Sequence, residues 1–510
     1  MSAAGTMTNE TNKSVRTGAF LSNLIPVLSL LFTGYPLAPA TIRTVLVGRM
    51  PIIVAVTQFM LGDRFQTFVR NLYRSVGNVS IYSGAWAKAE RLLVTSCCIL
   101  LLPNAGLAYS VLTHEFIIDF LWKDQITPVL LSKFPATTPY ELKEAHAYAY
   151  GGSVIQDLGY YPFGRKYFSD LSHYARTGDF VVNLLAEATN VQEYAFALGA
   201  LAHYCADLGG HPAVNNAVAL TYPELAKKYG PAVTYEESHS AHLAVEFGFD
   251  VYQVAMNRFS FDDYHDFIGF KVSKALLQRA FLRTYGIPLQ EAIPQEDLAI
   301  GTYRRAVSKT IPKMTKVALA MRGKTSSAES PAIQQAIQYQ LTRADYETDF
   351  GKQYYKPALG YRITAALMKL IPPIGPAKKL HYKDPSPETE KLYLGSVKAT
   401  IDTYRAFLDD LQMGRELDLK DLNADTGAAT KRGEYGLADK TYSKLLAQLA
   451  KDHFACVTPE LRENILLFYG DSSASNRTKD NKNWKTTAVA LEQLPVRPVS
   501  AGMVEPCNAK

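Results

Sequence analysis

The 510-residue sequence predicts an all-α protein, on three observations. Apolar residues recur at helical spacing, as in the stretch that carries Phe116, Ile117, Phe120 and Leu121. Several such stretches begin with residues typical of helix caps. The alternating apolar and polar runs that predict strands are scarce, and no internal repeat is evident. We therefore expect a multi-helix fold throughout.

Composition and charge narrow the class of protein. With 47% hydrophobic and 20% charged residues, the chain has an ordinary globular composition and enough length for one large core or two smaller ones. Of the 54 Lys and Arg residues, nine lie in residues 1–108, which hold only three of the 48 Asp and Glu residues. The remainder has 45 of each sign and is neutral. We therefore expect no duplex nucleic acid partner, since proteins that bind duplex nucleic acid usually carry an excess of basic residues.

Residues 1–108 are predicted to be an N-terminal extension that ends in a signal-peptide-like segment. The sequence K-A-E-R at 88–91 is followed by an apolar run over 92–102 and then by small residues. This order is typical of a secretory signal peptide, here cleaved after Ala108. Its position far from residue 1 indicates either an assigned start codon too far upstream or a long leader. We expect a secreted or periplasmic protein that begins at Tyr109.

Local signals predict where the helices of the next region begin. Thr113 can cap the first helix. Residues 138–141, T-P-Y-E, combine a capping box with proline at the first helical position, so a second helix begins there and runs to Gly151-Gly152. The segment that follows Asp157 is rich in Gly, Pro and aromatic residues and is predicted to be a loop. The next two helix starts are predicted from a capping-box-like pair and from a single serine, namely Asn190 with Glu193, and Ser240.

Helical patterning continues beyond residue 260, with linkers at 324–331 and 371–387. The helices predicted there span 298–309, 331–345, 354–371, 388–412, 437–452 and 458–469. The segment D-x-N-x-D-x-G at 421–427 resembles half of a calcium loop, but its twelfth position is Arg432, so it is predicted to be a polar turn. The expected organisation is an extension over 1–108, a motif-bearing domain over 109–260, a helical extension over 261–470 and a disordered tail over 471–510.

Seven of the ten histidines fall between residues 114 and 242. His203 with Asp207, and His242 with Glu246, stand four residues apart, so each pair projects from one face of a helix. Imidazole nitrogen and carboxylate oxygen are ligands that Zn2+ favours, and helical bundles present them with this spacing. The pair Gly209-Gly210 is expected to end the first helix and to direct His211 towards a neighbouring ion.

Two histidines in the same region, His146 and His239, lack a carboxylate at the right spacing and are predicted to be ordinary core or surface residues. Cys205 lies between His203 and Asp207 and points away from their face, so it is predicted to be a core residue.

The order H-x-x-x-D, then H-P, then H-x-x-x-E, preceded by an isolated Asp and His, resembles the bacterial zinc-dependent phospholipases C. The single-strand-specific zinc nucleases share their tri-zinc helical fold. The resemblance covers roughly residues 109–255. It implies a multi-helix zinc domain of the phospholipase C/nuclease type, here followed by a helical C-terminal extension.

The resemblance also implies nine ligands for two or three Zn2+ ions. In the family the amino group and carbonyl of the first mature residue, a Trp, complete the first site. The implied ligands are, for the first ion, Tyr109, His114 and Asp207; for the second, Asp157, His173, His203 and the bridging Asp207; and for the third, His211, His242 and Glu246. Two departures weaken the correspondence: Tyr replaces Trp, and His211 follows Asp207 by four residues where the best-known phospholipases have six.

The implied function is zinc-dependent phosphodiester hydrolysis by metal-activated water. The resemblance favours a phospholipase C that acts at a membrane or lipid surface and releases diacylglycerol and a phosphorylated head group. By the same resemblance, Asp157 would orient or deprotonate the attacking water. The aromatic residues Tyr160, Tyr161 and Phe163 are candidates for an apolar, substrate-binding rim.

Two alternatives remain. A single-strand nuclease or 3′-nucleotidase could use the same ions, because bases stack on aromatic residues as readily as acyl chains pack against them. A non-catalytic module stabilised by metal is the other, although structural zinc sites are usually rich in cysteine. The sequence indicates no protein partner.

Overall fold

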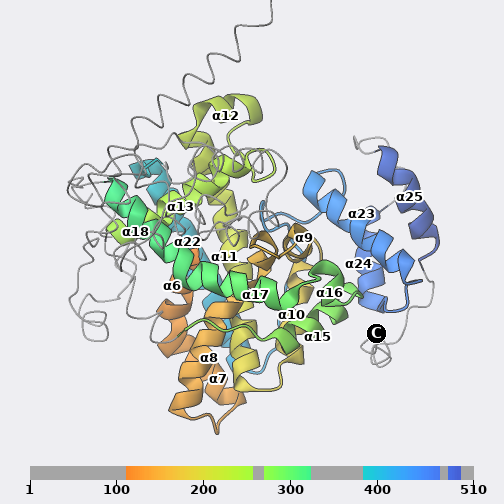
Figure 1. The fold of residues 1–510 in the computed structure, drawn as a ribbon, viewed down its shortest axis with the longest axis horizontal. Coiled ribbons are helices and arrows are strands. Elements are labelled where there is room, and N and C mark those ends of the chain that lie inside the picture. Colours follow the sequence, from red (N-terminus) through yellow and green to blue (C-terminus); the bar gives the residue numbers. More distant parts are fainter. Residues whose placement is uncertain (1–110, 257–268, 323–382, 471–480, 495–510) are drawn as a thin grey trace, which may run out of the picture. The chain divides into compact units, whose positions relative to one another are not determined.

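The computed structural model describes residues 111–256, 269–322, 383–470 and 481–494 (Figure 1). Within these ranges all regular elements are helices, and the only β-type contact is an isolated antiparallel bridge between Leu422 and Ala429. The prediction of an all-α protein is therefore confirmed. The elements are α6 (Val111–Leu121), η1 (Trp122–Ile126), α7 (Thr127–Lys133), α8 (Pro139–Gly152), η2 (Ile155–Tyr160), α9 (Lys166–Tyr174), α10 (Thr177–Glu187), α11 (Val191–Thr221), α12 (Pro223–Tyr229), α13 (His239–Ala255), α15 (Lys274–Tyr285), α16 (Leu289–Ala292), α17 (Glu296–Arg305), η3 (Ala306–Thr310), α18 (Ile311–Arg322), α22 (Pro387–Gln412), α23 (Gly436–Lys451), α24 (Pro459–Tyr469) and α25 (Asn481–Glu492).

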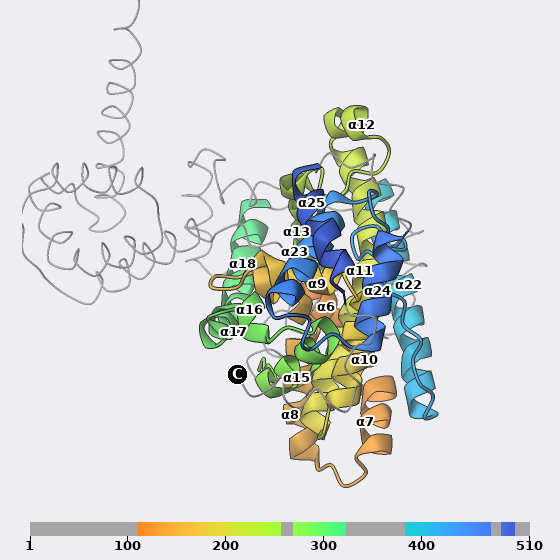
Figure 2. The ribbon, with the colours of Figure 1, turned by 90° about the vertical axis from the view of Figure 1, so that its right-hand side faces the viewer.

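The 31-residue helix α11 is the central element, and α6, α8, α10, α13 and α22 all pack against it (Figures 1 and 2). As predicted, Asn190 caps it by accepting a hydrogen bond from the backbone N–H of Glu193. The carboxylate of Glu193 accepts from the backbone N–H of Thr189 rather than from that of the cap residue. None of the described helices is long and apolar enough to cross a membrane.

The prediction that Gly209-Gly210 ends this helix is wrong, because α11 continues through both glycines to Thr221. Neither glycine has a positive φ. Gly209 instead allows α22 to approach closely, since a Cβ at this position would lie 2.8 Å from Oγ1 of Thr400. Packing against a second helix thus explains a glycine whose local meaning suggested a helix end.

Other helix starts agree in part with the local signals. The capping box at Thr138 and Glu141 is confirmed at the start of α8. The prediction that Ser240 caps a helix is wrong, since α13 begins at His239. The predicted loop after Asp157 begins as the 3-10 helix η2. Helix α6 begins at Val111, ahead of the predicted start at Thr113.

Among the described residues, the larger hydrophobic cluster contains side chains from Val111 to Leu494. It includes residues on both sides of position 260, where a domain boundary was predicted. The hydroxyl of Tyr404 on α22, for example, donates a hydrogen bond of 2.9 Å to the carbonyl of Leu198 on α11.

Several predictions for the C-terminal half can be compared with the structure. Four helices begin within two residues of their predicted starts, namely α17, α22, α23 and α24. The prediction of a disordered tail over 471–510 is wrong for residues 481–492, which form α25. The leader over 1–108, the helices predicted over 331–345 and 354–371, and the linker over 324–331 lie outside the described residues.

Helices α8 and α11 contact each other backbone to backbone at two glycines. A Cβ at Gly152 would overlap the carbonyl oxygen of Phe196, and one at Gly199 would overlap that of Ala149. The close approach fixes the spacing between α11 and the turn that leads from α8 into η2, where Asp157 lies.

We expect Gly199→Ala to lower the free energy of unfolding by at least about 1–3 kcal/mol, because the added methyl group forces the two helices apart. Chemical denaturation measures this change. Gly301 is the matched control, since it is exposed on α17 and an added Cβ would meet no atom within 4 Å. Gly301→Ala should stabilise the protein by about 0.5–1 kcal/mol. Equal effects at the two sites would contradict the close packing of α8 and α11.

Candidate metal centre

Five elements bring eight of the nine predicted zinc ligands together. The side chains come from α6 (His114), η2 (Asp157), α9 (His173), α11 (His203, Asp207 and His211) and α13 (His242 and Glu246). None is more than 2% exposed. The three residues on α11 stand four apart and therefore share one face of that helix. The ninth predicted ligand, Tyr109, lies outside the described residues.

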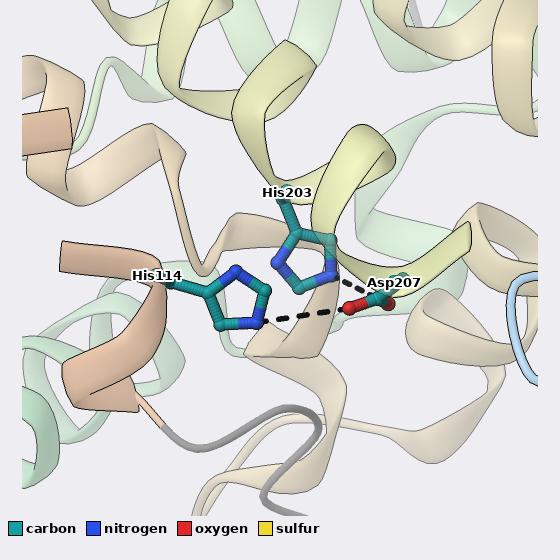
Figure 3. A group of neighbouring side chains, drawn as sticks. All are labelled: His114, His203 and Asp207. Carbon is teal, nitrogen blue, oxygen red and sulfur yellow. Dashed lines mark ion pairs between the residues drawn. The ribbon is translucent and has the colours of Figure 1, made fainter. Parts of the chain in front are cut away.

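Asp207 lies at the middle of the cluster. Its Oδ2 is 3.0 Å from Nε2 of His203 and 3.2 Å from Nε2 of His173. Its Oδ1 is 3.6 Å from Nε2 of His114 and 3.8 Å from Nε2 of His211. Figure 3 shows His114 and His203 facing Asp207 from α6 and α11. The two imidazole rings are stacked, with centroids 4.5 Å apart and an interplanar angle of 14°. Each oxygen of one carboxylate thus faces two imidazoles.

The ligand atoms form three groups, in each of which they lie within 4.8 Å of one another. The groups are His114, His203 and Asp207; Asp157, His173 and His203; and His211, His242 and Glu246. The third group has the composition that the resemblance implies. The first two differ from the implied sets in two respects, because His203 belongs to both and Asp207 belongs only to the first.

The second and third groups have close internal contacts. Oδ1 of Asp157 lies 3.3 Å from Nε2 of His173. Oε1 of Glu246 lies 3.0 Å from Nε2 of His242, one turn earlier on α13, and 3.4 Å from Nε2 of His211. In each contact the imidazole presents Nε2 to the carboxylate. In all five histidines, Nε2 is therefore the atom that could bind a cation together with the neighbouring carboxylate.

The donor set fits bound metal ions. Within the described residues, neither oxygen of Asp157 or of Asp207 accepts a hydrogen bond of normal geometry, although both carboxylates are buried. A buried carboxylate without such bonds is costly unless a cation is near it. Imidazole and carboxylate ligands without thiolates suit Zn2+ and are typical of catalytic rather than structural zinc.

Partners outside the cluster orient three of the imidazoles. Nδ1 of His173 lies 2.7 Å from the carbonyl oxygen of Ser169, and Nδ1 of His203 lies 2.9 Å from that of Ser153. Nδ1 of His211 lies 3.2 Å from Oδ1 of Asp425, an ion-pair contact outside hydrogen-bond geometry. In His173 and His203, a protonated Nδ1 that donates to the carbonyl leaves the lone pair of Nε2 for a metal ion.

A further buried carboxylate positions His114. Asp250 lies one turn beyond Glu246 on α13, and its Oδ2 accepts a 2.9 Å hydrogen bond from the backbone N–H of Leu112. Its Oδ1 accepts a 2.7 Å hydrogen bond from the hydroxyl of Thr113. The start of α6, and with it His114, is thereby held against α13, the helix that carries His242 and Glu246.

Burial and the opposing charges act together on the pKa values. Burial and the neighbouring His203 hold the pKa of His114 well below its usual value. Burial lowers the pKa of His173, but Asp157 and Asp207 outweigh burial and raise it well above the usual value. Burial raises the pKa of Asp207, but His203 and His211 outweigh burial and lower it. Asp207 therefore stays ionised, and Zn2+ would displace a proton from His173 when it binds.

The structure separates the three predicted rim residues. Tyr160 is close to the metal centre, with its ring 6.0 Å from that of His173 and 6.3 Å from that of Tyr235. Tyr161 is 2% exposed and packs edge-on against Tyr303 in the core, whereas Tyr160 is 9% exposed. Phe163 is half-buried and has a φ of 67°.

Three residues of the region were predicted not to be ligands, and none of them lies in a ligand group: His146, His239 and Cys205. Nε2 of His146 lies 3.2 Å from Oδ1 of Asp119, and its ring stacks 3.7 Å from Trp122. The ring of His239 lies 4.2 Å from that of Tyr235. Cys205 is buried, as expected.

Sequence reasoning missed Asp425 and Tyr235. The ring of Tyr235 packs edge-on against that of His242 at 5.6 Å and lies 6.3 Å from that of Tyr160. Tyr235 therefore lies between a residue of the third ligand group and an aromatic residue beside the second. Asp425 lies in the segment predicted to be a polar turn, and nothing in local spacing connects it to His211. Burial raises the pKa of Asp425, but His211 outweighs burial and lowers it to about 2.

Comparison with known proteins agrees with this geometry. The model of the family described as zinc dependent phospholipase C matches residues 113–293, a range that contains all eight clustered side chains. No curated protein and no solved structure matches the chain significantly. The resemblance to the zinc-dependent phospholipases C is therefore confirmed for residues 113–293.

Proposed function

We propose that the protein is a zinc-dependent phospholipase C that hydrolyses glycerophospholipids to diacylglycerol and a phosphorylated head group. The observation that carries this proposal is the set of three adjoining ligand groups, joined through His203 and Asp207, inside the region that matches the family. The ligands are imidazoles and carboxylates, which is the chemistry expected of hydrolytic rather than structural zinc.

The eight clustered side chains would hold two or three Zn2+ ions, with Tyr109 completing the first site through its amino group and carbonyl. When bound, Zn2+ polarises phosphoryl oxygens, lowers the pKa of a water molecule and offsets the negative charge of the leaving oxygen. Three neighbouring groups can thus serve both the attacking and the leaving side of one phosphodiester.

Asp157 is the proposed proton acceptor. It lies on η2, its carboxylate is fully buried, and its Oδ1 faces His173 at 3.3 Å. One oxygen can contribute to the second ligand group while the other orients the attacking water and accepts its proton. Asp207 is less suited to this task because both of its oxygens face imidazoles.

Tyr160 is the proposed substrate contact among the aromatic residues, because it lies beside His173 and Tyr235. Phe163, on the same segment, is a candidate for contact with acyl chains. Burial raises the pKa of the Tyr160 hydroxyl well above its usual value, so it remains a neutral hydrogen-bond donor.

We expect Asp157→Asn to leave the protein folded and to lower turnover by about a hundredfold or more, since the amide cannot accept the proton. Turnover on phosphatidylcholine and the circular dichroism spectrum should be measured together. Asp402→Asn is the control, because Asp402 is an exposed carboxylate on α22. Full activity in the Asp157 variant would remove this residue from the mechanism.

Parallel assays of the zinc-loaded protein on phosphatidylcholine vesicles and on single-stranded DNA should give diacylglycerol and intact DNA. A chelator should abolish the activity, and added Zn2+ should restore it, because the buried carboxylates require the metal ions. Cleavage of DNA without cleavage of lipid would identify a nuclease instead. Bound zinc with neither activity would identify a non-catalytic, metal-stabilised module.

The proposed location is outside the cytoplasm, by way of the leader that ends near Ala108. N-terminal sequencing of the protein exported by its own host should give Tyr109 as the first residue. This result is expected because the first site needs a free amino group at that position. A protein that remains inside the cell and retains residues 1–108 would contradict both the location and the role of Tyr109.

A further inference from the structure

A segment of the C-terminal extension lies directly against the metal centre. Within residues 419–435, the backbone N–H of Ala424 donates a 2.9 Å hydrogen bond to the carbonyl of His173 on α9. The hydroxyl of Tyr204 on α11 donates to the carbonyl of Lys420 at 2.8 Å. The segment is therefore attached to α9 and α11, two of the three elements that supply ligands to the second group.

The backbone at Asp425 is held in place independently of its carboxylate. The side chain of Asn215 on α11 donates a 2.7 Å hydrogen bond to the carbonyl of Asp425. Oδ1 of Asn423 accepts hydrogen bonds from the backbone N–H groups of Asp425, at 2.9 Å, and of Thr426, at 3.2 Å. Gly427 completes the turn at a φ of 67°. This turn uses the Asp, Asn and Gly residues that suggested a polar turn.

The Asp425 carboxylate has a distinct partner on each oxygen. It is 2% exposed, and its Oδ1 lies 3.2 Å from Nδ1 of His211. Its Oδ2 accepts a 2.9 Å hydrogen bond from the hydroxyl of Tyr174 and another from the hydroxyl of Tyr435. The two hydroxyls fix the carboxylate so that its other oxygen points at His211.

The opposite nitrogen of His211 faces the third ligand group. Its Nε2 lies 3.4 Å from Oε1 of Glu246, which in turn lies 3.0 Å from Nε2 of His242. The imidazole of His211 therefore lies between the Asp425 carboxylate and the position of the candidate ion. The contact between Asp425 and Nδ1 lies outside hydrogen-bond geometry, but a negative charge beside Nδ1 favours the proton at that nitrogen and leaves Nε2 for the ion.

We propose that Asp425 is a positioning residue that aims His211 at the third metal ion, so that the C-terminal extension completes the metal centre. Asp425 lies outside residues 113–293, the part that matches the family. The inference rests on the proposed function only in that the third ligand group binds Zn2+. It assigns a role to residues 419–435 that the sequence did not indicate.

The test measures the zinc affinity of the full chain, with Asp425→Asn and Asp425→Glu as variants. Chelator competition under equilibrium conditions gives the affinity of each bound ion, and the melting temperature of the metal-free protein reports on structure. Asp421→Asn is the matched control from the same segment. Oδ1 of Asp421 accepts hydrogen bonds from the backbone N–H groups of Gly178 and Asp179, and no described contact joins it to the ligand groups.

We expect Asp425→Asn to lower the binding affinity of one zinc ion by about 10–100-fold and to leave the affinities of the others unchanged. Asp425→Glu should recover part of the loss because it restores the carboxylate. Asp421→Asn should lower the melting temperature but leave every zinc affinity at the wild-type value. Tyr435→Phe, which removes one hydroxyl from Asp425, should weaken the same ion by a smaller factor and keeps the test valid if Asp425→Asn fails to fold.

Wild-type zinc affinity in Asp425→Asn would overturn the inference, as would an equal loss in Asp421→Asn or the absence of a third ion in the wild-type protein. These readouts do not depend on the substrate. A protein that shows the expected change in zinc affinity but cleaves no phospholipid would therefore contradict the proposed function and not the role of Asp425.

Discussion

The metal centre depends on one buried carboxylate, that of Asp207, which faces four imidazoles from three helices. Such a group is stable away from water only when positive charge or strong donors surround it. The four imidazoles partly meet this need, and bound cations would complete it. His114 on α6 and His173 on α9 both contact Asp207 on α11. These electrostatic contacts therefore also constrain how the three helices pack.

The unbroken course of α11 gives the site its regular geometry. His203, Asp207 and His211 occupy successive turns, so one rigid helix spaces the ligands of all three groups. Two glycines of the helix allow its neighbours to approach: Gly199 admits α8, and Gly209 admits α22. Gly199 stands four residues before His203 and therefore shares the face that carries the ligands. A side chain at Gly199 would therefore disturb the spacing of α8 and α11 beside the ligand groups.

The C-terminal extension is part of the same core and of the same site. Helix α22 packs along α11 (Figure 2), and residues 419–435 cover α9 and reach His211. The three described outer contacts of the histidines follow one rule, since each Nδ1 faces an oxygen. Two of these oxygens are nearby backbone carbonyls, whereas the third is a side-chain carboxylate from the extension. The extension is therefore expected to influence metal binding as well as stability.

The sequence by itself determined the features that depend on neighbouring residues. The helical periodicity, the caps at Thr138 and Asn190, and the ligand pairs four residues apart are all local, because a helix places residue i beside residue i+4 whatever surrounds it. The tertiary structure decided the features that depend on distant partners. Gly209 lies inside a helix where the lack of a Cβ admits Thr400, and Tyr161 packs edge-on against Tyr303 in the core. Asp425 meets His211 because two segments far apart in the chain fold together. No spacing rule relates such residues, since their proximity is fixed by the packing of the whole core.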